Sequence, residues 1–264
     1  MKIAVCFFGI TRKLKEHTLE SIEQCLLAPV AQRDPSYKKF GHFNLVHQIS
    51  NPRTGEENIP VDPHEYKLLQ CDLISHTDQD RLDAGFDCGI FEKFGDAWED
   101  NFSSLRNLLR QLHSLNQVTE LLIQARQQFD LVIYSRVDLG FEGKVEIPRV
   151  RPGTLYTPWF SKSGGLNDRF AMGDFATMVK YGQRGSTARQ YCQETGRPLH
   201  AERFLSWYAR KHGMHTVDLT SIGFHRVRAN GTVPSWDATM RTRLRHRCKR
   251  ALSRLKNLAL GHNA

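Results

Sequence analysis

The sequence lacks the long apolar run of a membrane span and the paired cysteines of a metal or disulfide framework. No stretch approaches the roughly 18 consecutive apolar residues that cross a bilayer. The six cysteines are scattered, without a Cys-x-x-Cys pair, which predicts reduced and mostly structural thiols. The first ten residues are strand-like and too short for a signal peptide, and the basic residues Arg12, Lys13 and Lys15 follow the apolar run instead of preceding it. We therefore expect a cytoplasmic protein.

Acidic residues are missing from the last part of the chain. The formal net charge is +9, and no Asp or Glu follows residue 237. Eight Lys and Arg residues lie after that point, so residues 1–237 carry only about +1 of the formal charge. A basic sequence pI of about 9.4 therefore describes the tail rather than the body, and it does not indicate a nucleic-acid-binding protein as a whole.

The apolar pattern of residues 1–237 predicts an α/β domain. Residues 2–8, apolar from Ile3 onward, and the continuous apolar run 131–134 are typical of strands buried on both faces of a sheet. Leucines and other apolar residues recur at threes and fours through 103–127, which predicts a long helix leading into the second of these strands. A shorter helix over 18–27 is expected to stop at Pro29, and residues 51–63, with three prolines and a glycine, are expected to form a polar loop.

The central strand ends in a charged pair, Arg136 and Asp138. Side chains two apart share a face of an extended strand, so both should project the same way. Ligands of open α/β sheets gather outside the carboxyl ends of strands, where this pair lies. An arginine can neutralise a diphosphate, and a carboxylate oxygen is a ligand that Mg²⁺ or Mn²⁺ prefers. The alternative is an ordinary ion pair at a strand end, worth about 0–1 kcal/mol if exposed.

Five stretches, which follow one another along the chain in the family's order, resemble a group of bacterial and viral GT-A-type glycosyltransferases. The stretch Tyr-Ser-Arg-Val-Asp-Leu around Arg136 resembles their Arg-x-Asp strand end, which stands in place of Asp-x-Asp. The other stretches are the opening strand with Gly9 and Arg12, the helical segment 110–115, the run Asn-Asp-Arg-Phe-Ala-Met-Gly at 167–173, and His200-Ala201-Glu202. The resemblance implies a GT-A-like, Rossmann-type fold with a mixed, mainly parallel sheet flanked by helices.

The resemblance also implies roles for single residues. Nucleotide-sugar contacts would come from the residues Gly9, Ile10, Arg12, Gln111, Ser114, Arg136, Asn167 and Arg169. Asp138 would face a divalent metal, Mn²⁺ or Mg²⁺, and His225 resembles a late-chain metal ligand of such enzymes. Because Arg136 replaces the first carboxylate of the better-known motif, the arginine itself could carry part of the charge neutralisation.

Two carboxylates are candidates for the base that takes the acceptor's proton. Asp168 lies in a polar run between apolar residues, where Asn167 and Arg169 would complement sugar hydroxyls. Glu202 lies at the start of a predicted helix, so an ordinary role at the helix N-terminus competes with the catalytic one. The sequence leaves both candidates open.

Residues 238–264 form a separate unit, a basic amphipathic tail with apolar residues at helical spacing from Met240 to Leu258. A basic amphipathic helix suits an anionic membrane surface, which would make the protein peripheral on the inner face of the membrane. A solvated basic end and a nucleic-acid contact are the alternatives.

Together these features predict a glycosyltransferase domain at 1–237. It would move a sugar from a nucleoside-diphosphate donor to a hydroxyl of a glycan or lipid-linked glycan, as in surface polysaccharide biosynthesis, with no nucleic-acid partner. The alternative from another class is a non-enzymatic nucleic-acid-binding protein acting through its tail. A nucleotidyltransferase is a third possibility, but no glycine-rich phosphate loop follows Gly9.

Overall fold

The structure is a computed structural model in which residues 1–234 are described. The basic tail, and with it the predicted C-terminal helix and membrane contact, lies outside the described residues. No helix within residues 1–234 is long and apolar enough to cross a membrane.

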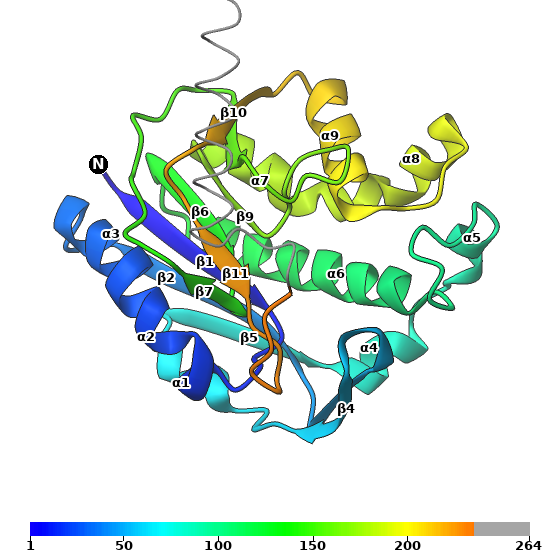
Figure 1. Ribbon diagram of the computed structural model, residues 1–264. Helices are drawn as coiled ribbons and strands as arrows, with labels where there is room; N and C mark the ends of the chain where they lie inside the picture. Colours follow the sequence, from blue (N-terminus) through cyan, green and yellow to red (C-terminus); the bar gives the residue numbers. More distant parts are fainter. Residues whose placement is uncertain (235–264) are drawn as a thin grey trace, which may run out of the picture.

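A seven-stranded sheet runs through the middle of the molecule (Figure 1), in the order β10-β8-β9-β6-β1-β2-β5. Every neighbouring pair is parallel except those that include β9, which runs antiparallel to β6 and to β8. Its strands are β1 (Ile3–Gly9), β2 (Lys38–Leu45), β5 (Leu73–Asp78), β6 (Leu131–Arg136), β8 (Thr154–Pro158), β9 (Phe170–Gly173) and β10 (His215–Leu219). The mixed, mainly parallel sheet expected of a GT-A-like, Rossmann-type fold is thus confirmed.

Alternating side chains of β1 pack into two different cores, because successive residues of a strand point to opposite faces. Ile3, Val5 and Phe7 pack with the first helices of the chain, whereas the even-numbered residues pack with the long helix α6 (Ser103–Gln124). Figure 1 shows α1 to α3 and α6 on opposite sides of the sheet. Full burial of both faces explains why β1 and β6 read as uninterrupted apolar runs.

The other helices are short. They are α1 (Leu14–His17), α2 (Leu19–Ser21), α3 (Ala28–Arg33), α4 (Gln79–Ala84), α5 (Gly89–Glu92), α7 (Phe175–Gln183), α8 (Ala188–Thr195) and α9 (Ala201–Lys211). A π-helical turn, η1 (Ile22–Leu27), connects α2 to α3. The 3₁₀ turns are η2 (Pro52–Thr54), η3 (Glu65–Leu69) and η4 (Arg184–Thr187).

The prediction that the first helix stops at Pro29 is wrong. Pro29 lies in the first turn of α3, directly after η1, and the carbonyl oxygen of Cys25, four residues before it, accepts from the Val145 N–H at 2.7 Å instead.

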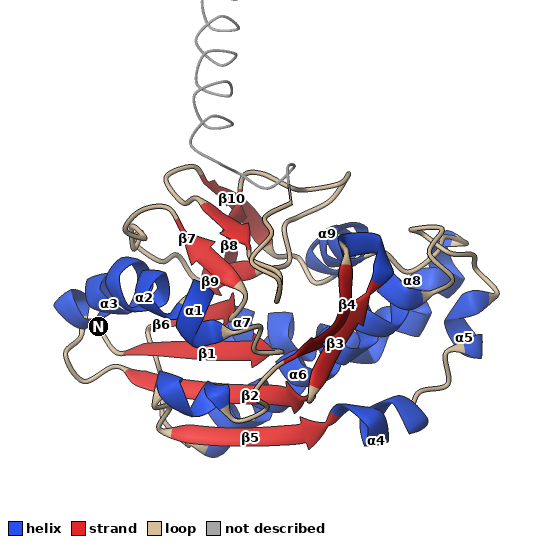
Figure 2. Ribbon diagram, turned by 60° about the horizontal axis from the view of Figure 1, so that its bottom comes forward, coloured by secondary structure: helices blue, strands red, loops and turns tan. Residues whose placement is uncertain are grey.

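Two small antiparallel ribbons complete the architecture. β7 (Leu139–Phe141) pairs with β11 (Phe224–Arg226), and β3 (Gln48–Asn51) pairs with β4 (Glu56–Pro60). The prediction of a polar loop over 51–63 is therefore wrong, since most of this stretch belongs to η2 and β4, with Pro52 in η2 and Pro60 at the end of β4. Figure 2 shows the β3–β4 ribbon standing out from the sheet beside α6. The ribbon becomes one wall of the cavity described next.

Parallel pairing brings the ends of three strands to one edge of the sheet. In the register of β1, Phe8 pairs with Arg136 of β6 and Gly9 pairs with Phe43 of β2. The sequence-predicted residues at the ends of β1 and β6 therefore lie next to each other. This is the edge at which open α/β sheets bind ligands.

Candidate active site

A cavity of about 360 Å³ opens at this edge of the sheet. Its walls come from the ends of β1, β2 and β6, the β3–β4 ribbon, α6, the loop after β8, the first turn of α9, and the end of β11 with the residues that follow it. The volume lies within the range of about 300–1,000 Å³ common for small-molecule sites. Eight of the sequence-predicted residues line it: Gly9, Ile10, Arg12, Gln111, Arg136, Asp168, Arg169 and Glu202.

Arginines dominate the charge of the cavity wall. Besides the predicted three, four further arginines line it, namely Arg53, Arg110, Arg226 and Arg228. None of these four arginines was predicted from the sequence to belong to the site. The sequence did contain a pattern that could have indicated Arg226 and Arg228, because two arginines spaced by two in an extended segment share a face. For Arg53 and Arg110 no local pattern was available.

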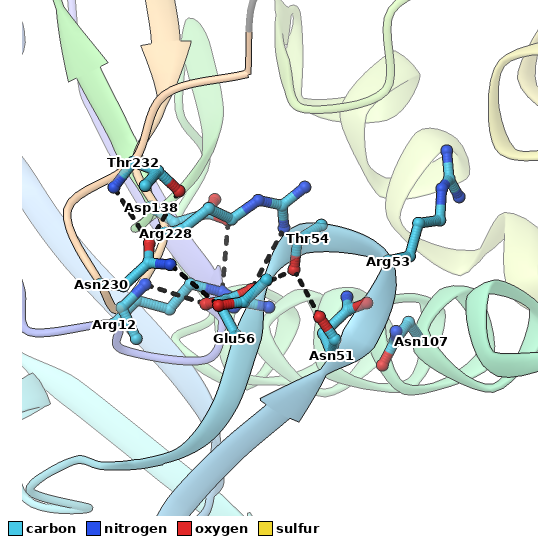
Figure 3. A network of polar contacts seen from close by, with 12 residues as sticks. Arg12, Asn51, Arg53, Thr54, Glu56, Asn107, Asp138, Arg228, Asn230 and Thr232 are labelled. Carbon is cyan, nitrogen blue, oxygen red and sulfur yellow. Dashed lines mark hydrogen bonds and ion pairs between the residues drawn. The ribbon is translucent and has the colours of Figure 1, made fainter.

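Buried carboxylates behind the wall hold several of these arginines in place (Figure 3). Glu56 of β4 is fully buried and accepts hydrogen bonds from Arg12 Nη1 at 2.7 Å, Thr54 Oγ1 at 2.7 Å and the backbone N–H of Ala229 at 2.9 Å. Arg228 Nη1 lies 3.9 Å from the same carboxylate. Burial alone would raise the pKa of Glu56, but Arg12 and these hydrogen bonds lower it, so the group is charged at neutral pH. No pattern in the sequence indicated Glu56 as a site residue, because it falls in the stretch 51–63 that was expected to form a polar loop.

Asp138 orients Arg136 in the same way. Its Oδ1 accepts from Arg136 Nε at 2.8 Å and its Oδ2 from Arg136 Nη2 at 2.5 Å, while Arg12 Nε lies 3.7 Å from Oδ2. Asp138 is 3% exposed and, unlike Arg136, does not line the cavity. Burial disfavours the charged form, yet the neighbouring arginines lower the pKa of Asp138 far below its ordinary value. The carboxylate thus lies behind its arginine rather than facing a ligand.

The residues present do not fit a divalent metal. Both oxygens of Asp138 are engaged by Arg136, and the second predicted ligand, His225, has its Nδ1 3.3 Å from Glu142 Oε1. Neither Asp138 nor His225 lines the cavity, and residues 1–234 contain no cluster of three or more His, Cys, Asp or Glu side chains arranged to hold a metal ion. Of the two residues proposed as metal ligands from the sequence, Asp138 is bound by Arg136 through both oxygens, and His225 contacts Glu142 through one ring nitrogen.

A glutamine connects the arginine wall to the opposite carboxylate. Gln111 of α6 accepts from Arg136 Nη1 at 2.8 Å through its carbonyl oxygen and donates to Asp168 Oδ2 at 2.5 Å through its amide nitrogen. The backbone oxygen of Asp168 accepts from the Tyr181 hydroxyl at 3.1 Å. The orientations of Arg136, Gln111 and Asp168 are therefore fixed by one another.

Glu202 lies in the same cavity, at the start of α9. Its Oε1 is 3.3 Å from Arg169 Nη2 and its Oε2 is 3.3 Å from His200 Nδ1. Burial, followed by the charge of Asp168, raises the pKa of Glu202 to about 7 in spite of Arg169. Burial and the nearby Arg203 lower the pKa of His200 to about 4, so this imidazole is neutral at pH 7. The site therefore contains a carboxyl group that can exchange a proton near neutral pH.

Two other predicted residues are structural neighbours of the cavity and do not line it. Ser114 is fully buried, where its hydroxyl accepts from the Gly9 N–H at 2.9 Å and donates to the His42 carbonyl oxygen at 2.8 Å. Asn167 is also fully buried, where it donates to the Phe160 carbonyl oxygen at 3.0 Å and accepts from the Arg169 N–H at 3.0 Å. Ser114 thus supports the turn after β1, and Asn167 supports the turn that carries Asp168 and Arg169.

Comparison with known proteins gives no close relative. No family model matches the chain, and no curated protein matches its sequence. Among solved structures, the chain is similar to the apo form of mouse xyloside xylosyltransferase 1, with 11% sequence identity and a TM-score of 0.40. That match covers 83% of this chain and 85% of the other. At this level the likeness identifies no family, so the function has to be argued from the site itself.

Proposed function

We propose that the protein is a nucleotide-sugar-dependent glycosyltransferase in which arginines, rather than a metal ion, neutralise the donor's diphosphate. The observation that carries this proposal is the division of one cavity into two chemical halves. Guanidinium groups held by buried Glu56 and Asp138 form one half. Asp168 and Glu202, the latter with a pKa raised to about 7 by burial and by Asp168, belong to the other.

The arginine half suits a diphosphate. Guanidinium groups bind phosphate oxygens through paired, charge-assisted hydrogen bonds. Buried carboxylates fix Arg12 and Arg136 before any ligand arrives, so little side-chain entropy is lost on binding. Gly9 has a φ of +109°, and a Cβ there would meet nothing within 4 Å, so the backbone turns off β1 beside open space. A phosphate can approach the main chain closely at such a glycine.

Asn44, at the end of β2, offers a place for the nucleobase. Its side-chain amide donates to the Arg110 carbonyl oxygen at 3.2 Å, but its Oδ1 has no hydrogen-bond partner within residues 1–234. The residue is 3% exposed and lines the cavity. A buried acceptor without a donor is costly, and an N–H group on the edge of a base would remove that cost once the Asn44 amide turns its oxygen toward the cavity.

The carboxylate half suits the acceptor. In the transfer, the acceptor hydroxyl oxygen bonds to the anomeric carbon of the sugar, and the bond from that carbon to the diphosphate oxygen breaks. The electron pair of the broken bond leaves with the diphosphate, where Arg12 and Arg136 stabilise the charge. The hydroxyl proton passes to a carboxylate. Glu202 fits this role best, because its pKa of about 7 matches a base that works at neutral pH.

The proposal is tested by calorimetric titration of the full chain with nucleoside diphosphates, monophosphates and nucleosides in the presence of EDTA. We expect at least one nucleoside diphosphate to bind, and its nucleoside to bind about 100-fold more weakly, since hydrogen bonds to charged groups contribute about 1.5–3 kcal/mol each. Adding Mn²⁺ should leave the affinity unchanged. Binding that appears only with Mn²⁺ would contradict the arginine-based site, and no binding by any nucleotide would contradict the proposed function.

Glu202 is positioned by the close contact between Gly165 and the first turn of α9. A Cβ added at Gly165 would lie 1.9 Å from the Glu202 carbonyl oxygen, so Gly165→Ala must displace the first turn of α9. We expect transfer to fall by about 100-fold, the effect of misplacing a reacting group by about 1 Å. Gly143→Ala is the matched control, because a Cβ there would meet nothing within 4 Å. Initial transfer rates of both variants, with thermal unfolding as a check on the fold, decide the matter. Equal transfer rates in Gly165→Ala and Gly143→Ala would show that catalysis does not depend on this contact.

The nucleic-acid alternative gains no support from residues 1–234. It depends on the basic tail, which lies outside the described residues. The acceptor class, a glycan or lipid-linked glycan, and the membrane contact stay predictions from the sequence.

A further inference from the structure

A second cavity, of about 400 Å³, lies between α8 and α9. Three arginines line it, Arg197, Arg203 and Arg210, together with the aromatic side chains of Tyr191 and Trp207. No acidic residue is part of its wall. Its composition differs from that of the candidate active site, where carboxylates are built into the wall.

The three arginines have no carboxylate partners within residues 1–234. Arg203 donates to the Ser163 carbonyl oxygen at 3.3 Å and Arg210 to Ser206 Oγ at 2.9 Å, but none of the three forms an ion pair there with an Asp or Glu. Glu194, at the end of α8, is instead bound to Lys211. In the candidate active site, by contrast, Arg12, Arg110 and Arg136 each have a carboxylate partner. Guanidinium groups that share a cavity without an acid form a site for an external anion.

The two cavities are separated by a thin wall. Glu202 lines the first cavity and the next residue, Arg203, lines the second. Likewise Ser163 lines the first and Gly164 the second. Between them, the backbone N–H of Leu166 donates to the Glu202 carbonyl oxygen at 3.0 Å, which joins the loop after β8 to the first turn of α9. A chain molecule with one end at Glu202 can therefore continue over this wall into the second cavity.

We infer that the second cavity binds an anionic oligosaccharide, the part of the acceptor chain that lies beyond the reacting hydroxyl. Arginines bind its carboxylate, phosphate or sulfate groups, and the partly exposed Trp207, backed by the buried Tyr191, gives a sugar ring an aromatic surface. The recess between two helices and its few cations suit a short segment better than a flat, extended anionic surface. The inference rests on the proposed function for the role of the ligand as acceptor, but the binding site itself does not depend on it.

The test uses the full chain and tetragalacturonate as the probe, with neutral maltotetraose as the uncharged control. We expect tetragalacturonate to bind and maltotetraose to bind at least tenfold more weakly. Arg197→Gln/Arg210→Gln should weaken tetragalacturonate binding at least tenfold. This variant spares Arg203, which also holds Ser163 of the first cavity wall. Arg33→Gln/Arg151→Gln removes the same charge from exposed positions outside both cavities and should bind like the wild type.

Nucleoside-diphosphate affinity, measured on the same samples, tests the proposed nucleotide-sugar site separately from the proposed oligosaccharide site. The Arg197→Gln/Arg210→Gln variant should bind the nucleoside diphosphate as tightly as the wild type. Loss of that affinity would overturn the inference, because the two arginines would then support the whole protein and not a separate anion site. Unchanged tetragalacturonate binding in this variant would also overturn it. So would tighter binding of single-stranded DNA or of phosphatidylglycerol vesicles that depends on the same two arginines. Failure of nucleotide binding by the wild type, with tetragalacturonate binding intact, would remove the proposed function and leave the second site standing.

Discussion

Glu202→Gln is expected to lower the rate of sugar transfer by about 10²–10⁴-fold, the usual loss when a general base is removed. Glutamine keeps the size and polarity of the side chain but cannot take a proton. Nucleoside-diphosphate binding should be unchanged, because the arginine half of the cavity is intact. Glu146→Gln, at an exposed position outside the cavity, is the matched control and should transfer normally.

The pH dependence gives an independent readout of the same group. The base form of Glu202 is the carboxylate, so kcat/KM of the wild type should rise with pH and level off above the pKa of about 7. The folded pKa of Glu202 is raised above its ordinary value of 4.5, so this group makes the folded state less stable as pH rises from about 4.5 to about 7. Glu202→Gln should lose both dependences. If Asp168 is the base, Asp168→Asn will abolish transfer and Glu202→Gln will not.

Asp138→Ala is expected to destabilise the fold by about 3–5 kcal/mol, the cost typical of removing one partner of a buried ion pair. Arg136 would keep its charge in a partly buried position without its carboxylate, and Arg12 would lose a neighbour. Asp218→Ala is the control, because its ion pair with Lys162 is exposed and such pairs contribute about 0–1 kcal/mol. Urea unfolding at pH 7 measures both variants.

The stabilising contribution of Asp138 should depend on pH. The folded pKa of Asp138 is depressed, so its stabilising contribution is present above its ordinary value of 3.8 and is lost as pH falls through the folded pKa. The gap in stability between wild type and Asp138→Ala should therefore narrow in strong acid. A variant as stable as the wild type that has lost a Mn²⁺-dependent activity would show instead that Asp138 is a metal ligand, as the sequence suggested.

The sequence determined the frame of this protein. Strands buried on both faces must be continuously apolar, so the apolar runs of β1 and β6 predicted these two strands. Apolar residues at helical spacing predicted α6. Parallel pairing then placed Gly9 and Arg136 at one edge of the sheet, and Gln111 of α6 lines the same cavity. Local burial patterns were sufficient for these features because each element buries a face of its own.

Only the tertiary structure decided which charges meet. Arg12 and Glu56 are 44 residues apart, and the Ala229 N–H that also binds Glu56 is 173 residues away. Strand periodicity predicted that Arg136 and Asp138 lie together, but not that Asp138 turns behind its arginine instead of toward a metal. The partner of a buried charge is set by whichever opposite charge the packing brings within reach, and that depends on contacts distant in sequence, which no local pattern records.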